Sequence, residues 1–381
     1  ALAGATRLWD REGEALIIVA CPFTHLATQW EEEIEPFQFN STLAFGTSST
    51  WTDRLAKKLH GLSAGYIDNL VVLTTHDTLK NPKFYELIEG AEYDPLLVVD
   101  GVHDAGSPQR KKGVRPSYLY RLGLSATPER WFDEEGTEWL FDYFDDTVFE
   151  FSLAQAIPRF LTPYEYIPSF VELQRDELTE YKEETRKIVR KAHATDDLES
   201  DETLQLYLIL RKRIIKNAQA KYDQLEGILD DLDSHDHTLI YCSPQQIDEV
   251  QERLNRRGII QSRFTGEDPT EERKELLRSF DKGTHEMLVA MKCLDQGVDV
   301  PATRRAVLMA SSGNPKQFIQ RRGRVLREAE GKEKAIIHDV IVVPSLEGSL
   351  DDETRKLERK ILLKELQRYY EFADTALNRQ A

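Results

Sequence analysis

The sequence predicts an α/β fold of two domains, each a parallel sheet flanked by helices, with a helical insertion in the second domain. Three observations support this prediction. At 381 residues the chain exceeds the size at which a single hydrophobic core keeps growing. Short β-branched runs alternate with longer amphipathic stretches, and this alternation occurs twice along the chain. A charged, strand-free block that is strongly helical in composition lies between the two occurrences.

Three apolar runs in the first half are predicted as buried parallel strands, because each is short, rich in β-branched residues and bounded by polar or Gly/Pro residues. They lie at 15–20, 70–73 and 96–99. Amphipathic stretches at 26–34 and 52–62 are predicted as helices between them. Strands that alternate with helices imply a parallel sheet covered on both faces.

The same alternation returns in the second half of the chain. Strands are predicted at 238–242, 287–290, 306–309 and 335–338, and helices at 247–257 and 269–280. Glu271 and Glu272 place acidic side chains in the first turn of the last of these helices, which favours a helix start there.

Composition shifts predict the domain boundaries. Residues 149–171 are rich in aromatic residues and proline and are predicted to be an extended crossover. We expect a first domain over 1–155, incomplete at its N-terminus, and a second domain over 156–348. The second domain would contain the helical insertion at about 175–232. Residues 349–381 are predicted to form a long amphipathic C-terminal helix.

Composition also limits the partners and the compartment. No apolar run approaches the roughly 20 residues that a membrane helix needs, so no membrane partner is expected. The N-terminus has no signal-peptide pattern, so we expect a cytoplasmic or nucleoid-associated protein and not a secreted one. Cys21, Cys242 and Cys293 lie in or beside apolar runs and are predicted to be buried free thiols. The formal net charge of −17 does not exclude a nucleic-acid partner, because binding follows where the charges lie.

The segment with the most specific chemistry is Gln320-x-x-Gly323-Arg324-x-x-Arg327. It is predicted to lie on a helix after a strand and a Gly-Asn-Pro loop, with the two arginines on one helix face. Guanidinium groups aimed across a cleft at a triphosphate stabilise transition-state charge as arginine fingers. Gly323 would allow close backbone approach, and Gln320 can hydrogen-bond a neighbour. Basic residues on a helix are usually surface residues, so the interpretation depends on their spacing with Gln and Gly.

Two segments in the first domain follow predicted strands and are candidates for gripping nucleic-acid phosphates. Pro22, His25, Gln29 and Trp30 come after the first strand, where backbone amides and polar side chains can hold phosphates. Thr74 and Thr75 come at the end of the next strand. Each segment alone is equally well explained as an ordinary strand-to-helix turn.

Two further segments complete the series. Ser125 and Thr127 carry small hydroxyl groups at a strand end, where they could couple a phosphate site to a nucleic-acid site. Asp295, Gly297 and Asp299 follow the 287–290 strand, where carboxylates and a glycine turn could contact nucleotide and nucleic-acid backbone. The fixed order of all these segments is far more specific than any one of them.

Together these segments resemble superfamily 2 helicases and translocases of the DExH branch, closest to XPB-like and restriction-type motors, over nearly the whole chain. The resemblance implies two RecA-like domains, ATP and Mg²⁺ as cofactors, and nucleic acid as partner, with DNA favoured over RNA. Protein partners in a larger complex are a further expectation.

The same resemblance assigns roles to individual residues. It implies that Asp100 holds Mg²⁺ through water and that His103 couples the site to the second domain. It also implies that Asp295, Gly297 and Asp299 bind the nucleotide. The segment Phe264-Thr265-Gly266 resembles one that such motors lay against nucleic acid.

The sequence departs from the family pattern at two places. No Gly-x-x-x-x-Gly-Lys-Ser/Thr loop occurs, and residues 1–10 resemble the helix that follows it, so we expect the loop before Ala1. Gly101 stands where relatives have the Glu that orients the attacking water. Losing a positioned base costs about 10²–10⁴ in rate, so negligible ATP turnover is expected of this chain. An engineered change, a naturally degenerate motor and a sequencing variant would each explain Gly101.

Two functions follow from the sequence. The first is an ATP-dependent DNA helicase or translocase core acting in repair, restriction or phage defence. The alternative is a catalytically inactive pseudo-helicase that binds nucleic acid or serves as a protein scaffold, and Gly101 favours it. A nuclease is a third class, but no Asp…Glu-x-Lys cluster lies on a predicted strand, so a nuclease would lie outside this chain.

Overall fold

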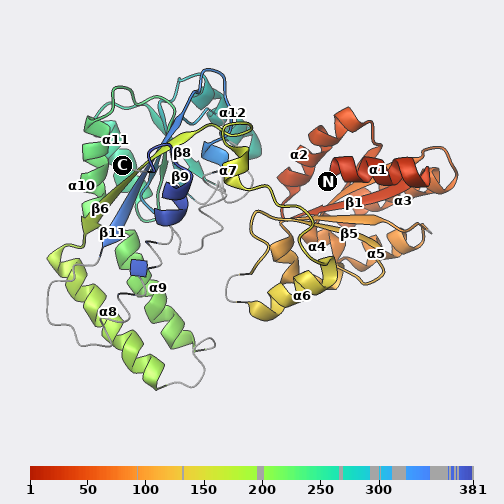
Figure 1. Ribbon diagram of the computed structural model, residues 1–381, viewed down its shortest axis with the longest axis horizontal. Helices are drawn as coiled ribbons and strands as arrows, with labels where there is room; N and C mark the ends of the chain where they lie inside the picture. Colours follow the sequence, from red (N-terminus) through yellow and green to blue (C-terminus); the bar gives the residue numbers. More distant parts are fainter. Residues whose placement is uncertain are drawn as a thin grey trace. The chain divides into compact units, whose positions relative to one another are not determined.

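In the computed structural model the chain forms two compact units, Ala1–Glu150 (unit 1) and Phe151–Ala381 (unit 2), each built on a parallel sheet (Figure 1). The predicted α/β class with helix-flanked parallel sheets is confirmed. The expected domain boundary at 155 lies close to the observed one at Glu150. The structure describes residues 1–91, 93–130, 133–194, 201–265, 269–291, 300, 302–310, 323–343, 359, 362–363, 366 and 369–379.

Unit 1 contains a five-stranded sheet in the order β2-β3-β1-β4-β5. All of its pairings are parallel. Every residue of β1 and β3 is buried, as expected for central strands covered on both faces. The strands are β1 (Ala15–Cys21), β2 (Ser41–Ala44), β3 (Asn69–Thr75), β4 (Leu96–Asp100) and β5 (Tyr120–Leu124).

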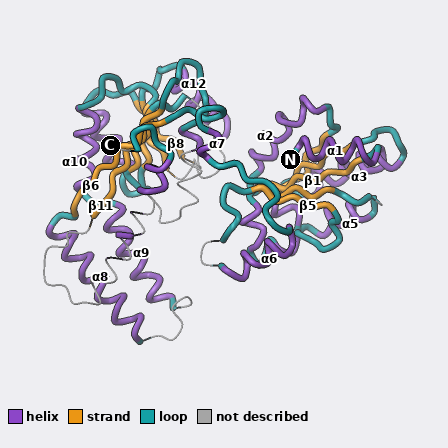
Figure 2. The backbone as a smooth tube through the Cα atoms, in the orientation of Figure 1, coloured by secondary structure: helices purple, strands orange, loops and turns teal. Residues whose placement is uncertain are grey.

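Helices cover both faces of the unit 1 sheet (Figure 2). Successive strand residues point to opposite faces, so β1 gives Leu16 and Ile18 to one core and Ile17 and Val19 to the other. The first core is closed by α3 (Ser48–Ser63), α4 (His76–Leu79), α5 (Pro82–Glu89) and α6 (Glu134–Phe144). The second is closed by α1 (Leu2–Glu12) and α2 (Thr24–Ile34). Short 3-10 helices lie at Glu35–Phe37, Val102–Gly106 and Lys111–Gly113.

Unit 2 contains a six-stranded sheet in the order β6-β11-β10-β7-β9-β8, again parallel throughout. Its strands are β6 (Tyr164–Glu172), β7 (Thr238–Tyr241), β8 (Gln261–Thr265), β9 (Met287–Met291), β10 (Arg305–Leu308) and β11 (Ala335–Val343). One face packs against α10 (Ala220–Asp230) and α11 (Ile247–Arg256). The other packs against α12 (Thr270–Asp281) and Phe372, and the short α7 (Leu153–Ala156) lies at the start of the unit.

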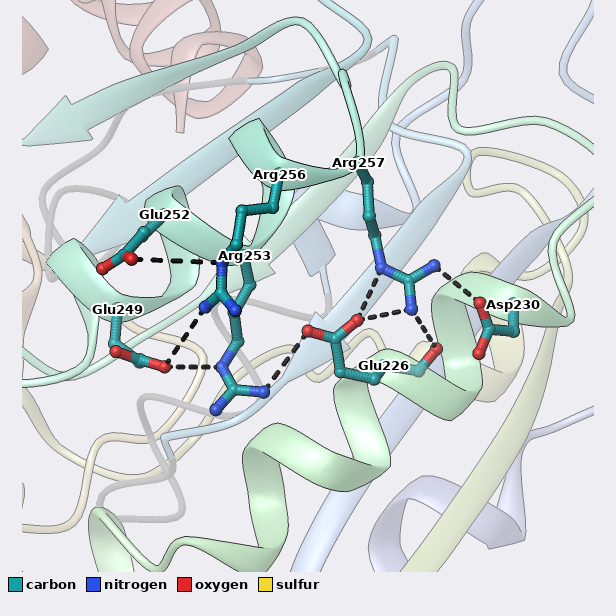
Figure 3. Close-up of polar contacts among 7 residues, drawn as sticks. All are labelled: Glu226, Asp230, Glu249, Glu252, Arg253, Arg256 and Arg257. Carbon is teal, nitrogen blue, oxygen red and sulfur yellow. Dashed lines mark hydrogen bonds and ion pairs between the residues drawn. The ribbon is translucent and has the colours of Figure 1, made fainter.

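The predicted helical block contains three helices with two different roles. α8 (Arg175–His193) and α9 (Glu202–Lys216) form a hairpin that extends from the sheet of unit 2 (Figure 1). α10 instead belongs to the core, because Leu225 and Ile228 are buried against the sheet. An ion-pair network also ties α10 to α11 and the turn after it (Figure 3). In it, Arg257 Nη1 lies 2.6 Å from Asp230 Oδ1, and Arg253 Nη1 lies 3.3 Å from Glu226 Oε1.

Three features differ from the sequence prediction or fall outside it. Residues 164–172 form β6, paired with β11 over nine residues, where an extended crossover was expected. The alternating burial of β6 and its two prolines nearby concealed it from a search for continuous apolar runs. Most of 349–381, predicted as a helix, lies outside the described residues. Of the helices described here, none combines the length and apolar character needed to span a membrane.

Candidate nucleotide and nucleic-acid site

The carboxyl edge of the unit 1 sheet gathers most of the site residues predicted for this unit. Because β1, β3, β4 and β5 are parallel, the segments that follow them meet at this edge. Pro22 follows β1, Thr75 ends β3, Asp100 ends β4 and Ser125 follows β5.

Asp100, the last residue of β4, is half-buried and is held by a tryptophan from another element. The indole Nε1 of Trp30, on α2, donates a hydrogen bond of 3.0 Å to Asp100 Oδ2. An indole can only donate, and a carboxylate accepts, so the direction of this bond is unambiguous. Burial and, to a smaller extent, the negative charge of Asp100 raise the pKa of the Cys21 thiol.

His76, at the start of α4, contacts the backbone of Asp100. Its Nε2 lies 2.9 Å from the carbonyl oxygen of Asp100, so Nε2 carries the proton and donates. Burial, helped by the positive charge of Arg110, lowers the pKa of His76 to about 4. His76 is therefore neutral at pH 7 and fixes the end of β4 without adding charge to the site.

Gly101 has a left-handed backbone, with φ of 66° and ψ of 43°. A Cβ added there would lie 3.4 Å from Pro22 Cγ. L-residues other than glycine pay roughly 1–2 kcal/mol in this region. The backbone at the expected general-base position therefore suits glycine, and a glutamate there would carry backbone strain.

His103 is joined directly to the segment after β5. Its Nδ1 lies 3.1 Å from Ser125 Oγ, with either atom able to donate. Ser125 Oγ in turn accepts a hydrogen bond of 3.1 Å from the backbone N–H of Thr127. A hydrogen-bond chain through His103, Ser125 and Thr127 thus connects the segment after β4 with the segment after β5.

Arg130 reinforces this connection and was not identified from the sequence. Its guanidinium donates to the carbonyl oxygen of His103 and, through Nε, to Asp133 Oδ2 at 2.6 Å. Asp133 caps α6 by accepting from the N–H of Gly136 at 2.7 Å. The hydrogen bond from Arg130 keeps the pKa of Asp133 below its ordinary value. The position of Arg130, just after the Ser-Ala-Thr-Pro segment, was the one available signal.

The predicted phosphate-gripping residues of unit 1 fall into two groups. Pro22, in the bend before α2, and His25 and Gln29, on α2, are half-buried, and the ring of His25 stacks on Phe23 with centroids 5.7 Å apart. Thr74 is fully buried and donates its hydroxyl to Ala44 O at 2.7 Å. The Thr75 hydroxyl caps α4 by accepting from Thr78 N. Both threonine hydroxyls thus make internal hydrogen bonds, and a phosphate contact of this segment stays a prediction.

In unit 2, Arg324 and Arg327 do not share a helix face as expected. Residues 323–325 are helical, Leu326 is in a turn, and Arg327 pairs with Leu161 in an antiparallel bridge. Thr162 donates its N–H to Leu326 O at 2.7 Å and its hydroxyl to Arg327 O at 3.3 Å, which fixes this backbone. The Arg327 side chain is exposed, and Arg324 is half-buried. A Cβ at Gly323 would meet no heavy atom within 4 Å, so no close approach to described residues is seen there.

The expectation that Phe264 lies against nucleic acid is also corrected. Its side chain is 0% exposed and packs with Phe280 in the core of unit 2. Thr265 is likewise buried, at 3% exposed. Both residues are the last of β8, where alternation points Phe264 inward. Five other predicted residues lie outside the described residues: Gly266, Asp295, Gly297, Asp299 and Gln320.

The described residues of unit 1 fit part of a Mg²⁺–nucleotide site. Mg²⁺ is commonly held by one or two carboxylates, with water and substrate phosphates completing its shell, and Asp100 offers such a carboxylate. Within the described part of the chain, no group of three or more His, Cys, Asp or Glu residues is placed to hold a metal by itself. Cys21 and Cys242 are buried free thiols, as expected, and Cys293 lies outside the described residues.

Comparisons with known proteins agree with this geometry. The family model described as "Type III restriction enzyme, res subunit" matches residues 1–130, and "Helicase conserved C-terminal domain" matches 220–329. The second match begins at α10, which the structure places in the core of unit 2.

Relatives and solved structures extend the likeness over most of the chain. DNA 3'-5' translocase XPB2 of Sulfurisphaera tokodaii is 26% identical over 368 residues, which covers 89% of this chain and 80% of that protein. The candidate DNA 3'-5' helicase Rad25 of Haloarcula marismortui is 26% identical over 83% of this chain, which spans only 44% of that relative. The ATP-dependent Type ISP restriction-modification enzyme LlaBIII bound to DNA shares the fold, with a TM-score of 0.61 and 14% identity over 96% of this chain and 27% of LlaBIII.

Proposed function

This chain carries the core of a superfamily 2 helicase or translocase, and we propose that it binds DNA as a motor core whose own ATP turnover is negligible. The family works by nucleotide-driven cycles of two RecA-like domains. For this chain we propose single-stranded DNA, held in part by His25 and Gln29 of α2. The name of the Sulfurisphaera relative and the DNA bound to LlaBIII support DNA over RNA.

The observation that carries the proposal is that two sets of hydrogen bonds at the carboxyl edge of unit 1 are joined by the backbone from Asp100 to His103. Asp100 is held by Trp30, and three residues later His103 is joined to Ser125 at 3.1 Å. A carboxylate suited to a metal–nucleotide complex is therefore linked to two neighbouring segments, one of which carries His25 and Gln29. Such a connection is what a motor needs to make DNA binding depend on nucleotide state.

Gly101 is the reason to propose negligible turnover. Its neighbours Asp100 and His103 keep their contacts, but position 101 offers no carboxylate to orient or deprotonate water. The loss of a positioned base costs about 10²–10⁴ in rate.

The left-handed backbone of Gly101 favours a second candidate, a pseudo-helicase that binds nucleic acid or a protein partner without hydrolysis. A position that had lost its glutamate recently would be expected to keep a backbone that suits glutamate. Here φ is 66°, where glycine is unstrained. Gly101→Glu tests the second candidate: recovered DNA-stimulated hydrolysis supports a motor short of one group and would contradict the binding module. Gly101→Ala is the matched control, because it adds the strain without the carboxylate.

DNA binding is tested by fluorescence anisotropy with a labelled oligo(dT) and an RNA of the same length, over a range of salt concentrations. We expect tighter binding to DNA, weakening as salt rises because phosphate contacts release counterions. Gln29→Ala should weaken binding about tenfold, the loss expected for one hydrogen bond of about 1.5 kcal/mol to a charged phosphate. Gln224→Ala, at a half-buried glutamine on α10, is the control and should bind normally. Equal affinity for RNA, or no binding, would contradict the proposal.

A further inference from the structure

Trp30 and Asp100 are 70 positions apart in the chain and are joined by one hydrogen bond of 3.0 Å. Trp30 lies on α2, one residue after Gln29, and its ring is half-buried against the core that α1 and α2 close. Asp100 ends β4, on the other side of β1 from β3 in the sheet order. The bond therefore connects a covering helix to the carboxylate at the end of a central strand.

The chemistry of the pair makes the bond an orienting one. The carboxylate of Asp100 can rotate about its terminal torsion, which is broad and roughly two-fold. A hydrogen bond to an ionised acceptor is stronger than one between neutral groups, so the indole N–H fixes this rotation. No other hydrogen bond to the Asp100 carboxylate is seen among the described residues. The orientation of the carboxylate thus depends on where α2 holds the indole.

We propose that Trp30 is a positioning residue, which sets the orientation of the Asp100 carboxylate and makes that orientation respond to DNA binding on α2. This inference rests on the proposed function, in which His25 and Gln29 of α2 contact DNA. A shift of α2 by a few tenths of an ångström moves the indole and with it the carboxylate. Coupling of this kind is reciprocal: a ligand bound at Asp100 and DNA bound on α2 change each other's affinity by the same factor.

A purely structural role for Trp30, anchoring α2 to the sheet, predicts something different. If Trp30 were only an anchor, replacing it would lower stability, but changes at Asp100 would leave the affinity for DNA unchanged. The distinguishing readouts are therefore a spectroscopic signal from the indole itself and a double-mutant cycle on DNA affinity.

The spectroscopic experiment uses the full chain labelled with 5-fluorotryptophan and ¹⁹F NMR. The sequence has five tryptophans, so the spectrum is simple, and Trp30→Phe assigns the signal of interest. Trp139→Phe is the control, since Trp139 stacks on Tyr143 in α6 at 5.3 Å and lies outside the proposed site. We expect Asp100→Ala to move the Trp30 signal more than the other four. Asp100→Asn, whose carbonyl oxygen still accepts, should restore most of the original position.

Oligo(dT) is then added to the labelled protein, and anisotropy gives its Kd for each variant. We expect DNA to shift the Trp30 signal, and Asp100→Ala to change the Kd about fivefold or more, the lower end of usual coupling. In the Trp30→Phe background the same Asp100→Ala change should alter the Kd less than about twofold.

Each outcome decides a separate point. If Asp100→Ala does not move the Trp30 signal, the positioning role is overturned, whatever the effect of DNA on that signal. The response to DNA is overturned if DNA binding leaves the Trp30 signal unmoved. It is also overturned if Asp100→Ala changes the Kd for DNA equally in the unmodified and Trp30→Phe backgrounds. Absence of DNA binding by the unmodified chain removes the proposed function and the response with it, while the ¹⁹F result with Asp100→Ala still decides whether Trp30 orients the carboxylate.

Discussion

Units 1 and 2 have the same parallel-sheet architecture but differ in how their predicted site residues are used. At the carboxyl edge of unit 1, Trp30 holds Asp100 by one hydrogen bond, and His103, Ser125 and Thr127 form a separate hydrogen-bond chain three residues further along. In unit 2, Phe264 and Thr265 belong to the core, and Arg324 and Arg327 lie on either side of a helix end. Topology alone brings strand-end segments together, whereas the direction of each side chain decides whether it serves the site or the core.

The largest expected effect tests the core role of Phe264 in unit 2. Phe264→Ala should destabilise this unit by about 3–5 kcal/mol, because it leaves a cavity beside Phe280. Phe264→Leu keeps most of the volume and should cost less than about 1.5 kcal/mol. Urea unfolding followed by circular dichroism measures both. If Phe264→Ala left stability unchanged and weakened only DNA binding, the residue would be a nucleic-acid contact after all.

Acid should weaken both units, because His76 in unit 1 is buried, His338 in unit 2 is half-buried, and both are neutral at pH 7. Burial lowers the pKa to about 4 for His76 in unit 1 and for His338 in unit 2. Unfolded histidine has a pKa near 6.5, so between about pH 6.5 and 4 the unfolded state binds protons that the folded state does not. Stability is thus full above about pH 6.5 and falls as pH drops, by up to about 3 kcal/mol for each histidine.

His76→Gln separates the two contributions. Glutamine keeps a donor for the Asp100 carbonyl but does not titrate, so unit 1 should lose most of its share of the acid sensitivity. Unit 2 should keep its own share, which provides an internal control. Urea unfolding at pH 7.5 and pH 5 measures the difference, and an unchanged acid dependence in the variant would refute the assignment to His76.

One substitution, glycine to alanine, should have opposite signs in the two units. At Gly123 on β5 an added Cβ would lie 2.8 Å from Val102 Cγ2, next to His103, and crowding of this kind costs about 1–3 kcal/mol. At Gly227, exposed on α10, an added Cβ meets nothing within 4 Å, and alanine should stabilise the helix by roughly 0.5–1 kcal/mol. Thermal unfolding of the two variants tests this, and a stabilising Gly123→Ala would show that the edge of unit 1 is looser than the structure indicates.

The smallest effects are expected in the ion-pair network between α10 and the end of α11 (Figure 3). Arg257 binds both Glu226 and Asp230, whereas Arg256 is 61% exposed and lies 3.9–4.0 Å from its partners. Arg257→Ala should lower the stability of unit 2 by roughly 1 kcal/mol and Arg256→Ala by close to zero. High salt should reduce the difference between the two variants. A larger loss from Arg256→Ala would contradict the ranking by geometry.

The sequence predicted most of the fold, because continuous apolar runs such as 15–20 and 70–73 mark strands buried on both faces. It missed β6, whose alternating burial produces no such run. The family pattern identified Asp100, His103 and Ser125, since strand ends in a parallel sheet meet at one edge. It could not show that Thr74 bonds Ala44 or that Phe264 points inward, because those depend on the neighbouring strand and on the phase of the pleat. Contacts between distant segments, such as Trp30 with Asp100, leave no local pattern to find.

The central claim is that the edge of unit 1 keeps its connections but lacks the group that activates water. Steady-state ATP hydrolysis, measured with and without oligo(dT) for the unmodified chain and for Asp100→Ala, tests it most directly. We predict no DNA-stimulated rate above that of Asp100→Ala, although the unmodified chain binds the oligonucleotide. A DNA-stimulated rate that Asp100→Ala abolishes would show that Gly101 does not silence the site, and would contradict the account.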